Sequence, residues 1–232
     1  MPFMFFDEYY LLLVVPTIFL SLWAQIMVKS TFAKYSKVPC SKKITGRDSA
    51  ALLLKSNSIS DVKIESVAGS LTDHYDPRTK VVRLSTPVFS ETSIAAIGVA
   101  AHEAGHAIQH AHSWGPLVLR STLVPVANIG SRFGPILAMI GLFYHESSMS
   151  ILFNIGIMLF AGAVLFYLIA LPVEFNASSR AVAILQENNV LTAEELQGVR
   201  KVLTAAAMTY VASALTAVMS LLRLILLSRR RR

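Results

Sequence analysis

The chain has 232 residues, of which 54% are hydrophobic and only 15% are charged, and its net charge is +7. A soluble domain of this length has about a quarter charged residues, so the composition indicates a membrane protein with one compact extramembrane portion. Its basic residues gather after the first apolar segment and in the run Arg229–Arg232; no basic patch alternates with aromatic residues, so nucleic acid is not expected as a partner. The single cysteine, Cys40, rules out an intramolecular disulfide and a cysteine-based zinc site.

The first predicted element is an N-terminal transmembrane anchor. Residues 11–28 are uncharged and long enough to span a hydrocarbon core of about 30 Å. A cleaved signal peptide is the alternative, but it would begin with basic residues, whereas this chain begins with Asp7 and Glu8. We therefore expect an uncleaved anchor over residues 1–28, followed by a single domain over residues 29–232.

The polar segment after the anchor is predicted to contain a short helix and a small β-sheet. The short helix is predicted over residues 48–55. Apolar and charged residues alternate over residues 62–65, the period of a half-buried strand. Residues 76–79 give the turn signal D-P-R-T, and residues 81–84 follow it as a second strand.

A longer helix should follow the sheet. Ser90 is the expected N-cap, with Glu91 in the first turn. The helix is predicted to continue to about Ser113 and to end at Gly115-Pro116. Its interior is rich in alanine and glycine, so other backbone can approach it closely.

His102, Glu103 and His106 form an H-E-x-x-H run inside this helix. Residues four apart lie on one helix face, so both imidazoles can reach one metal ion. Glu103 lies about 100° further round, where a general base for a metal-bound water is needed. A solvated polar helix is the weaker interpretation, because the flanking residues are apolar and burying these groups is costly unless they are paired or bind metal. The run therefore predicts a zinc hydrolase.

Two apolar helices are predicted beyond this run. They cover residues 117–144 and 151–171, and the short polar link 145–148 indicates a transmembrane hairpin. Arg132 interrupts the first of them; it can snorkel to the interface or face the protein interior, and the residues do not decide between the two.

A catalytic zinc takes three protein ligands and one water, so a third ligand has to come from elsewhere in the chain. Glu174 is the first candidate, because it is the only carboxylate between Glu146 and Glu187 and directly follows an apolar span. The alternative is an interfacial charge, and the residues alone favour neither reading.

His112 is the second candidate for this ligand. Its spacing from His106 fits the pattern H-E-x-x-H-x-x-G-x-x-H. Gln109 stands where that pattern needs a turn glycine. If the helix continues, His112 lies about 240° round from His106 and faces away. We interpret His110 and His112 as ordinary polar positions.

Three motifs occur together in this chain: H-E-A-G-H, L-P-V-E-F-N-A-S around Glu174, and T-D-H-Y-D-P-R-T-K. In combination they resemble the putative neutral zinc metallopeptidase family of bacterial multi-pass membrane proteins, over nearly the whole chain. That family is similar to the membrane-bound gluzincins, which include heat-shock membrane proteases and CAAX-processing proteases. The resemblance implies a mainly α membrane protein, in which transmembrane helices accompany a small zincin-like α+β extramembrane portion that carries the H-E-x-x-H helix.

The resemblance also implies the ligands of one catalytic zinc ion, namely His102, His106 and Glu174. Glu174 would be the glutamate of an E-x-x-A-D-like segment, with Ala177 as its alanine. The aspartate that normally supports such a site is replaced by Ser178. The residues that can take over this support are Ser178, Asn176 and Arg180.

These residues together predict a membrane-embedded zinc metalloendopeptidase. A zinc-activated water would attack the scissile carbonyl with Glu103 as general base, which later protonates the leaving amine. His74, Tyr75 and Arg180 are candidates for a further oxyanion donor. By analogy with zincins, residues 81–85 are the candidate edge strand that binds the substrate by strand addition.

Two other functions fit the same residues: an intramembrane-cleaving protease with the motif in a lipid-facing span, and a catalytically silent scaffold. The polar residues at both ends of the H-E-x-x-H helix, and the lack of a D-G motif in a later span, speak against the first. The complete H-E-x-x-H speaks against the second. The expected partners are the lipid bilayer and a protein or peptide substrate.

The chain is expected to be a multi-pass protein of the bacterial cell membrane with a cytoplasmic active site. Lysines after the first span favour the cytoplasm for the segment that follows, and the hairpin returns Glu174 to the side of His102. A capping box at residues 192–195 starts a helix that continues into the apolar segment 208–227. If that segment also crosses, residues 229–232 lie outside, against the same rule, so its full crossing is left open.

Overall fold

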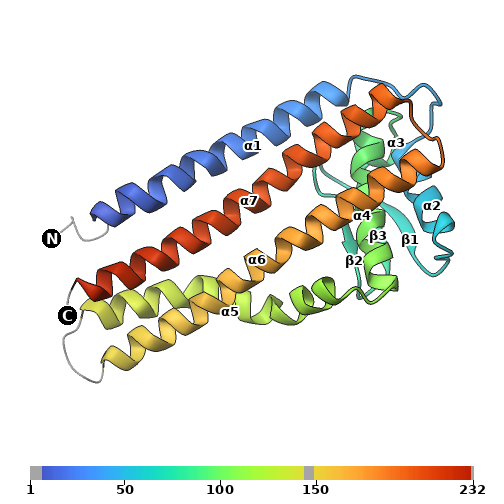
Figure 1. The fold of residues 1–232 in the computed structure, drawn as a ribbon. Coiled ribbons are helices and arrows are strands. Elements are labelled where there is room, and N and C mark those ends of the chain that lie inside the picture. Colours follow the sequence, from blue (N-terminus) through green and yellow to red (C-terminus); the bar gives the residue numbers. More distant parts are fainter. Residues whose placement is uncertain (1–6, 144–148, 231–232) are drawn as a thin grey trace. The chain divides into compact units, whose positions relative to one another are not determined.

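The computed structural model describes residues 7–143 and 149–230 of the chain (Figure 1). The predicted link at residues 145–148 lies outside the described residues. The division into an anchor over residues 1–28 and one domain over residues 29–232 stays a prediction. The chain separates into two compact units, which we call the helical unit and the mixed unit. The helical unit comprises residues 1–24, 118–172 and 209–232, and the mixed unit comprises residues 25–117 and 173–208.

The mixed unit contains a three-stranded sheet, formed by β1 (Lys63–Val67), β2 (His74–Asp76) and β3 (Val81–Ser85) in the order β1-β3-β2. The two strands predicted from alternation are confirmed, and β2 forms a hairpin with β3 around the predicted turn. β1 pairs with β3 in parallel. β3 is therefore the central strand, and its prediction as a substrate-binding edge is wrong, because both of its sides already carry hydrogen-bonded neighbours. β2 is the edge strand that contacts the H-E-x-x-H helix.

Three helices pack with this sheet. α2 (Gly46–Ser56) begins with a capping box between Thr45 and Asp48 and confirms the short predicted helix. α3 (Thr86–Ser90) precedes α4 (Ile94–Ala111), which carries the H-E-x-x-H run.

The predicted start of this long helix at Ser90 is wrong. Ser90 ends α3, and Ser93 is the N-cap of α4. The Ser93 hydroxyl accepts a hydrogen bond from the Ala96 amide at 3.2 Å. The predicted end at about Ser113 is confirmed, because α4 ends at Ala111, but Gly115-Pro116 does not close the helix. Ser113 takes a positive φ of 47° after α4, and Gly115 opens the next helix.

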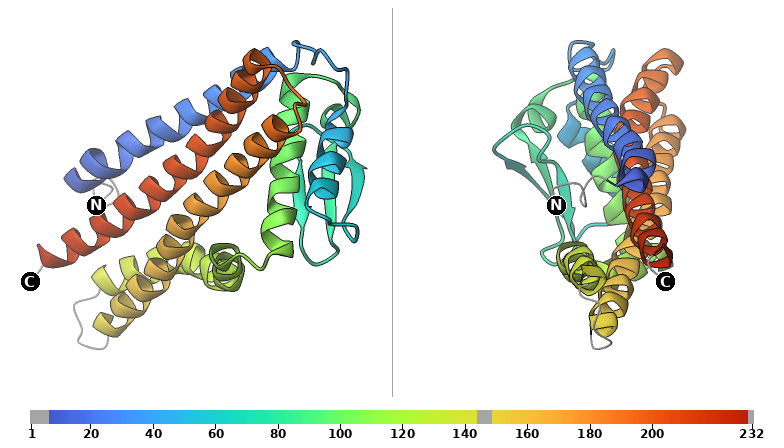
Figure 2. Two further views of the ribbon diagram at one scale, coloured as in Figure 1. Left: turned by 45° about the vertical axis from the view of Figure 1, so that its right-hand side comes forward. Right: turned by 90° about the vertical axis from the view of Figure 1, so that its left-hand side faces the viewer.

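The core of the mixed unit surrounds α4. α2 and the sheet lie on one side of α4, and the last turns of α6 lie on the other (Figure 2). Leu53, Leu84 and Ile108 are fully buried, and each such side chain contributes about 1.5–3 kcal/mol relative to an exposed one. Cys40 is buried in the same core.

Within the described residues, four helices are long and apolar enough to cross a membrane, which together with the composition makes the chain a membrane protein. The first is α1 (Val15–Tyr35), which continues a short π-helix. The others are α5 (Gly115–Phe143), α6 (Met149–Glu187) and α7 (Ala193–Arg229). The capping box at the start of α7 is confirmed by the hydrogen bonds between Thr192 and Glu195.

One expectation about α6 is corrected. The apolar helix predicted over residues 151–171 ends before Glu174. Instead α6 continues without interruption through Pro172 to Glu187.

Within the helical unit, α5 and α6 pack backbone against backbone. A Cβ atom on Gly130 would lie 2.1 Å from the Leu159 carbonyl oxygen, and one on Gly156 would lie 2.3 Å from the Ala138 amide nitrogen. Small residues thus let these helices touch, as in membrane helix pairs generally.

Arg132 is exposed, so it does not face the interior of the described chain.

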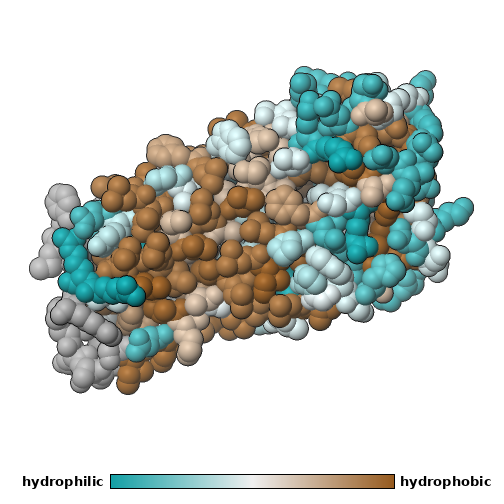
Figure 3. Space-filling model, in the orientation of Figure 1, coloured by the Kyte–Doolittle hydropathy of each residue, from teal (hydrophilic) through white to brown (hydrophobic). Residues whose placement is uncertain are grey.

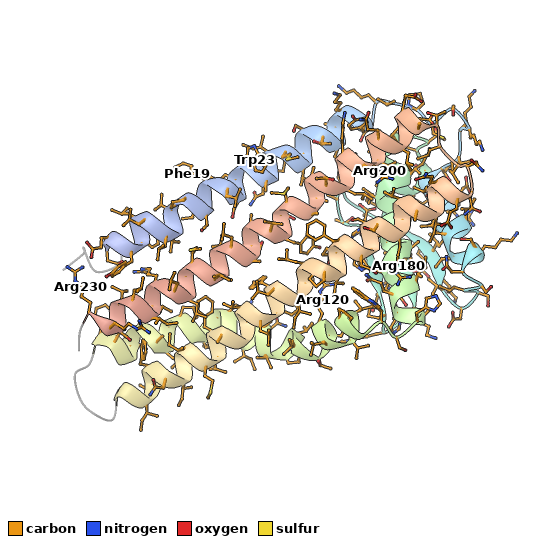
Figure 4. All side chains as sticks on the ribbon, in the orientation of Figure 1. Phe19, Trp23, Arg120, Arg180, Arg200 and Arg230 are labelled. Atoms are coloured by element: carbon orange, nitrogen blue, oxygen red, sulfur yellow. The ribbon has the colours of Figure 1, made fainter. Side chains whose placement is uncertain are left out.

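The outward faces of the helical unit are apolar. Phe19 and Trp23 are 67% and 50% exposed, and they project from α1 on the side away from α7 (Figure 4). Hydrophobic residues cover the visible face of this unit, whereas hydrophilic residues gather over the sheet of the mixed unit (Figure 3). Exposed apolar surface of this extent fits a lipid environment.

Candidate metal centre

Three side chains predicted as ligands converge in the mixed unit. His102 and His106 lie one turn apart on α4, and Glu174 reaches them from α6. The Glu174 Oε2 atom is 3.2 Å from His102 Nε2 and 3.4 Å from His106 Nε2. The described residues contain this one group of three histidine, cysteine or acidic side chains with ligand atoms close enough to share an ion. Glu174 is only 1% exposed.

The spacing of these atoms fits a zinc ion. Ligand atoms at about 2.0–2.2 Å from a tetrahedral zinc lie about 3.4 Å from one another. The two separations above match this value. Two imidazole nitrogens and one carboxylate oxygen are also the donor set of catalytic zinc sites that leave one position open.

Each histidine is oriented through its other ring nitrogen. His102 Nδ1 lies 3.0 Å from the Ser178 hydroxyl, and His106 Nδ1 lies 3.0 Å from Gln109 Oε1. Second partners of this kind hold metal-binding imidazoles in place and raise their basicity.

Gln109 determines the tautomer of His106. Its amide nitrogen donates to the Val173 carbonyl at 2.8 Å and to Asn176 Oδ1 at 3.0 Å, so its oxygen must accept from His106 Nδ1–H. The Nε2 lone pair of His106 is therefore directed at Glu174 and available to a metal. Arg180 completes the chain of hydrogen bonds by donating to Asn176 Oδ1 at 2.7 Å.

Sequence reasoning missed Gln109 as part of the site. It was noted only as the residue that replaces a turn glycine. Gln109 is fully buried. Its partners come from α6, so no local pattern on α4 indicates its role.

Close packing of α4 and α6 creates this site. A Cβ atom on Gly105 would lie 2.7 Å from the Ala177 carbonyl oxygen, so only glycine lets the helices approach this closely. Ala177 is fully buried at the same contact. The expected close approach of backbone to the alanine- and glycine-rich helix is thus confirmed.

Glu103 and Glu174 make the site favourable for a positive charge. Burial alone lowers the pKa of His106, but the hydrogen bond with Glu174 and the charges of Glu103 and Glu174 outweigh it and raise that pKa. A proton and a metal ion compete for the same Nε2 lone pair, so the two carboxylates favour a bound cation as well. Glu103 itself is 9% exposed.

The remaining candidates have other partners or are exposed. His74 is exposed, and its Nδ1 pairs with the Thr72 carbonyl oxygen at 2.8 Å. The Tyr75 hydroxyl pairs with His110 Nδ1 at 2.8 Å, which ties β2 to α4. Burial raises the pKa of Tyr75 to about 12, so its hydroxyl stays protonated at neutral pH. His112 is the exposed C-cap of α4, as the helix geometry predicts.

Replacing Gln109 by leucine is expected to lower zinc affinity about 10- to 100-fold, because His106 loses its orienting partner. Chelator competition on the purified protein measures this. The matched control is Gln186→Leu, an exposed glutamine on α6 outside the cluster. If the two variants bind zinc with equal affinity, Gln109 does not contribute to the metal site.

Comparison with known proteins identifies the family of the chain. Residues 10–229 match the family described as putative neutral zinc metallopeptidase. The chain is 49% identical over 218 residues to the putative membrane protease YugP of Bacillus subtilis (strain 168), covering 94% of this chain and 96% of that protein. No solved structure matches the chain. With a family match that spans nearly all of its length, the chain belongs to the putative neutral zinc metallopeptidases.

Proposed function

We propose that this protein is a membrane-embedded zinc metallopeptidase that hydrolyses peptide bonds. His102, His106 and Glu174 would hold one zinc ion. The observation that carries the proposal is the convergence of two Nε2 atoms and one carboxylate oxygen at zinc-like separations. The hydrogen bonds of Gln109 support it, because they leave His106 Nε2 available to a metal.

When bound, zinc would supply a Lewis acid and lower the pKa of a water toward about 7. The Glu103 carboxylate accepts the proton of the attacking water and later delivers it to the leaving amine. Glu103 suits this role because it follows His102 on α4 and is largely shielded from solvent. Ser178 and Gln109 act as positioning residues through the two histidines.

We place the substrate along β2. β2 is an edge strand and contacts α4, so an extended peptide can add to it as a further strand. Tyr75 and His110 join this strand to the helix that carries the site. The zincin-like character of this portion is part of the same proposal.

We further propose that the protein is multi-pass, with α1, α5 and α6 crossing the bilayer and the mixed unit on the cytoplasmic side. The lysines at the end of α1 support this orientation. Cleavage inside the bilayer is less well supported, because α4 is not among the four apolar helices of the described chain and packs with α2 and the sheet. A catalytically silent scaffold is also less well supported, because it would have no use for a general base such as Glu103.

Hydrolysis in water labelled with ¹⁸O tests the activity. We expect the purified protein, loaded with zinc, to cut unstructured peptides and to leave one ¹⁸O atom in each new carboxylate. Chelation should stop the reaction, and added zinc should restore it. Peptides that stay intact with stoichiometric zinc bound would favour the scaffold instead.

A further inference from the structure

A groove of about 340 Å³ lies between the end of α1 and the start of α7, within the mixed unit. The two helices run antiparallel there (Figure 1). They touch where Gly198 faces Tyr35, because a Cβ atom at Gly198 would lie 2.9 Å from the tyrosine ring. Tyr35 also lines the groove.

One end of the groove is strongly basic. Lys34, Arg200 and Lys201 all line it, and none of its lining residues in the described chain is acidic. The Lys34 ammonium lies 5.6 Å from the centre of the Tyr35 ring. Arg200, labelled in Figure 4, makes only a long contact of 3.5 Å with Gln186. All three cations are exposed and can approach an anion.

The other end of the groove is apolar. Met27 lines it, and the neighbouring Ile26 is 67% exposed on α1. Thr31 and Thr204 lie between the two ends and offer hydroxyl groups. Met27 and Lys34 are seven residues apart on one helix, which corresponds to about 10 Å along its axis. The headgroup layer on each side of a bilayer is about 5–8 Å thick, so this length is sufficient to reach from the hydrocarbon to the headgroups.

We propose that this groove binds one anionic phospholipid. Its phosphate lies against Lys34, Arg200 and Lys201, its glycerol region reaches the threonine hydroxyls, and one acyl chain follows Met27. Along the groove, basic, hydroxyl and apolar side chains follow one another in the same order as the phosphate, glycerol and acyl chain of a phospholipid. A free phosphate would leave the apolar end without a function.

Native mass spectrometry of the full-length protein tests this site. The protein is exposed in detergent to equal concentrations of phosphatidylglycerol and phosphatidylcholine with identical acyl chains. A basic residue near an anionic surface contributes about fivefold to binding. We expect the triple variant Lys34→Gln, Arg200→Gln, Lys201→Gln to bind phosphatidylglycerol at least about tenfold more weakly than the unmodified protein.

A second triple variant separates the groove from general charge. Lys29→Gln, Lys37→Gln, Lys43→Gln removes three exposed cations from the same region that do not line the groove. It should retain the preference for phosphatidylglycerol. The proposal is overturned if both variants lose it equally, if the unmodified protein binds both lipids alike, or if glycerol phosphate competes as well as the lipid does. Circular dichroism melting of both variants verifies that they are folded.

Discussion

Glu103→Gln is expected to reduce peptide hydrolysis by about 10²- to 10⁴-fold while the zinc content stays at one ion per chain. Glutamine has the shape of glutamate but cannot accept the proton of the attacking water at neutral pH. Glu103 is not among the three converging ligands, so its loss should leave the metal in place. Initial rates on a peptide substrate, with metal analysis of the same sample, measure both quantities.

The control for this variant is Glu187→Gln, an exposed glutamate at the end of α6. It should leave the rate unchanged. Unchanged hydrolysis by Glu103→Gln would exclude Glu103 as the base. Loss of zinc together with activity would instead make Glu103 part of the metal site.

The second large effect is expected for Glu174→Ala. Removing this carboxylate leaves two imidazoles, so tight zinc binding and activity should both be lost. A ligand that binds only the folded state stabilises it by about 2.7 kcal/mol at 100 times its Kd. Zinc should therefore raise the melting temperature of the unmodified protein and leave that of Glu174→Ala unchanged.

His112→Ala distinguishes the two candidates for the third ligand. His112 is exposed at the end of α4, so its removal should change neither zinc affinity nor the thermal shift. The assignment of Glu174 fails if Glu174→Ala keeps full zinc affinity while His112→Ala loses it.

The parts of the site that lie within one helix could be predicted from the sequence. The spacing of His102 and His106 determines their common face once α4 is helical, and the same geometry turns His112 away. Glu174 was different, because its spacing along the chain says nothing about which helix it meets. Only the resemblance to a family favoured it over an interfacial charge.

Contacts between helices account for most of what the sequence could not predict. The hydrogen bonds of Gln109 depend on the register of α4 against α6, which no local pattern encodes. Pro172 lies inside α6, where proline removes one backbone hydrogen bond. Neighbouring helices can compensate for that loss in apolar surroundings. The central position of β3 followed from a parallel pairing with β1, which alternation alone cannot reveal.

The distance between the two halves of the site along the chain has a consequence for biosynthesis. Glu174 is 72 residues beyond His102. At about 5–20 residues per second, a ribosome needs roughly 4–14 seconds to add it after the histidine. During this time α5 and the first part of α6 are made, while the nascent chain holds two histidines and no carboxylate to close the cluster. If the protein has the proposed activity, its site stays incomplete until most of α6 has been synthesised, and a fragment that ends before Glu174 would lack the third ligand.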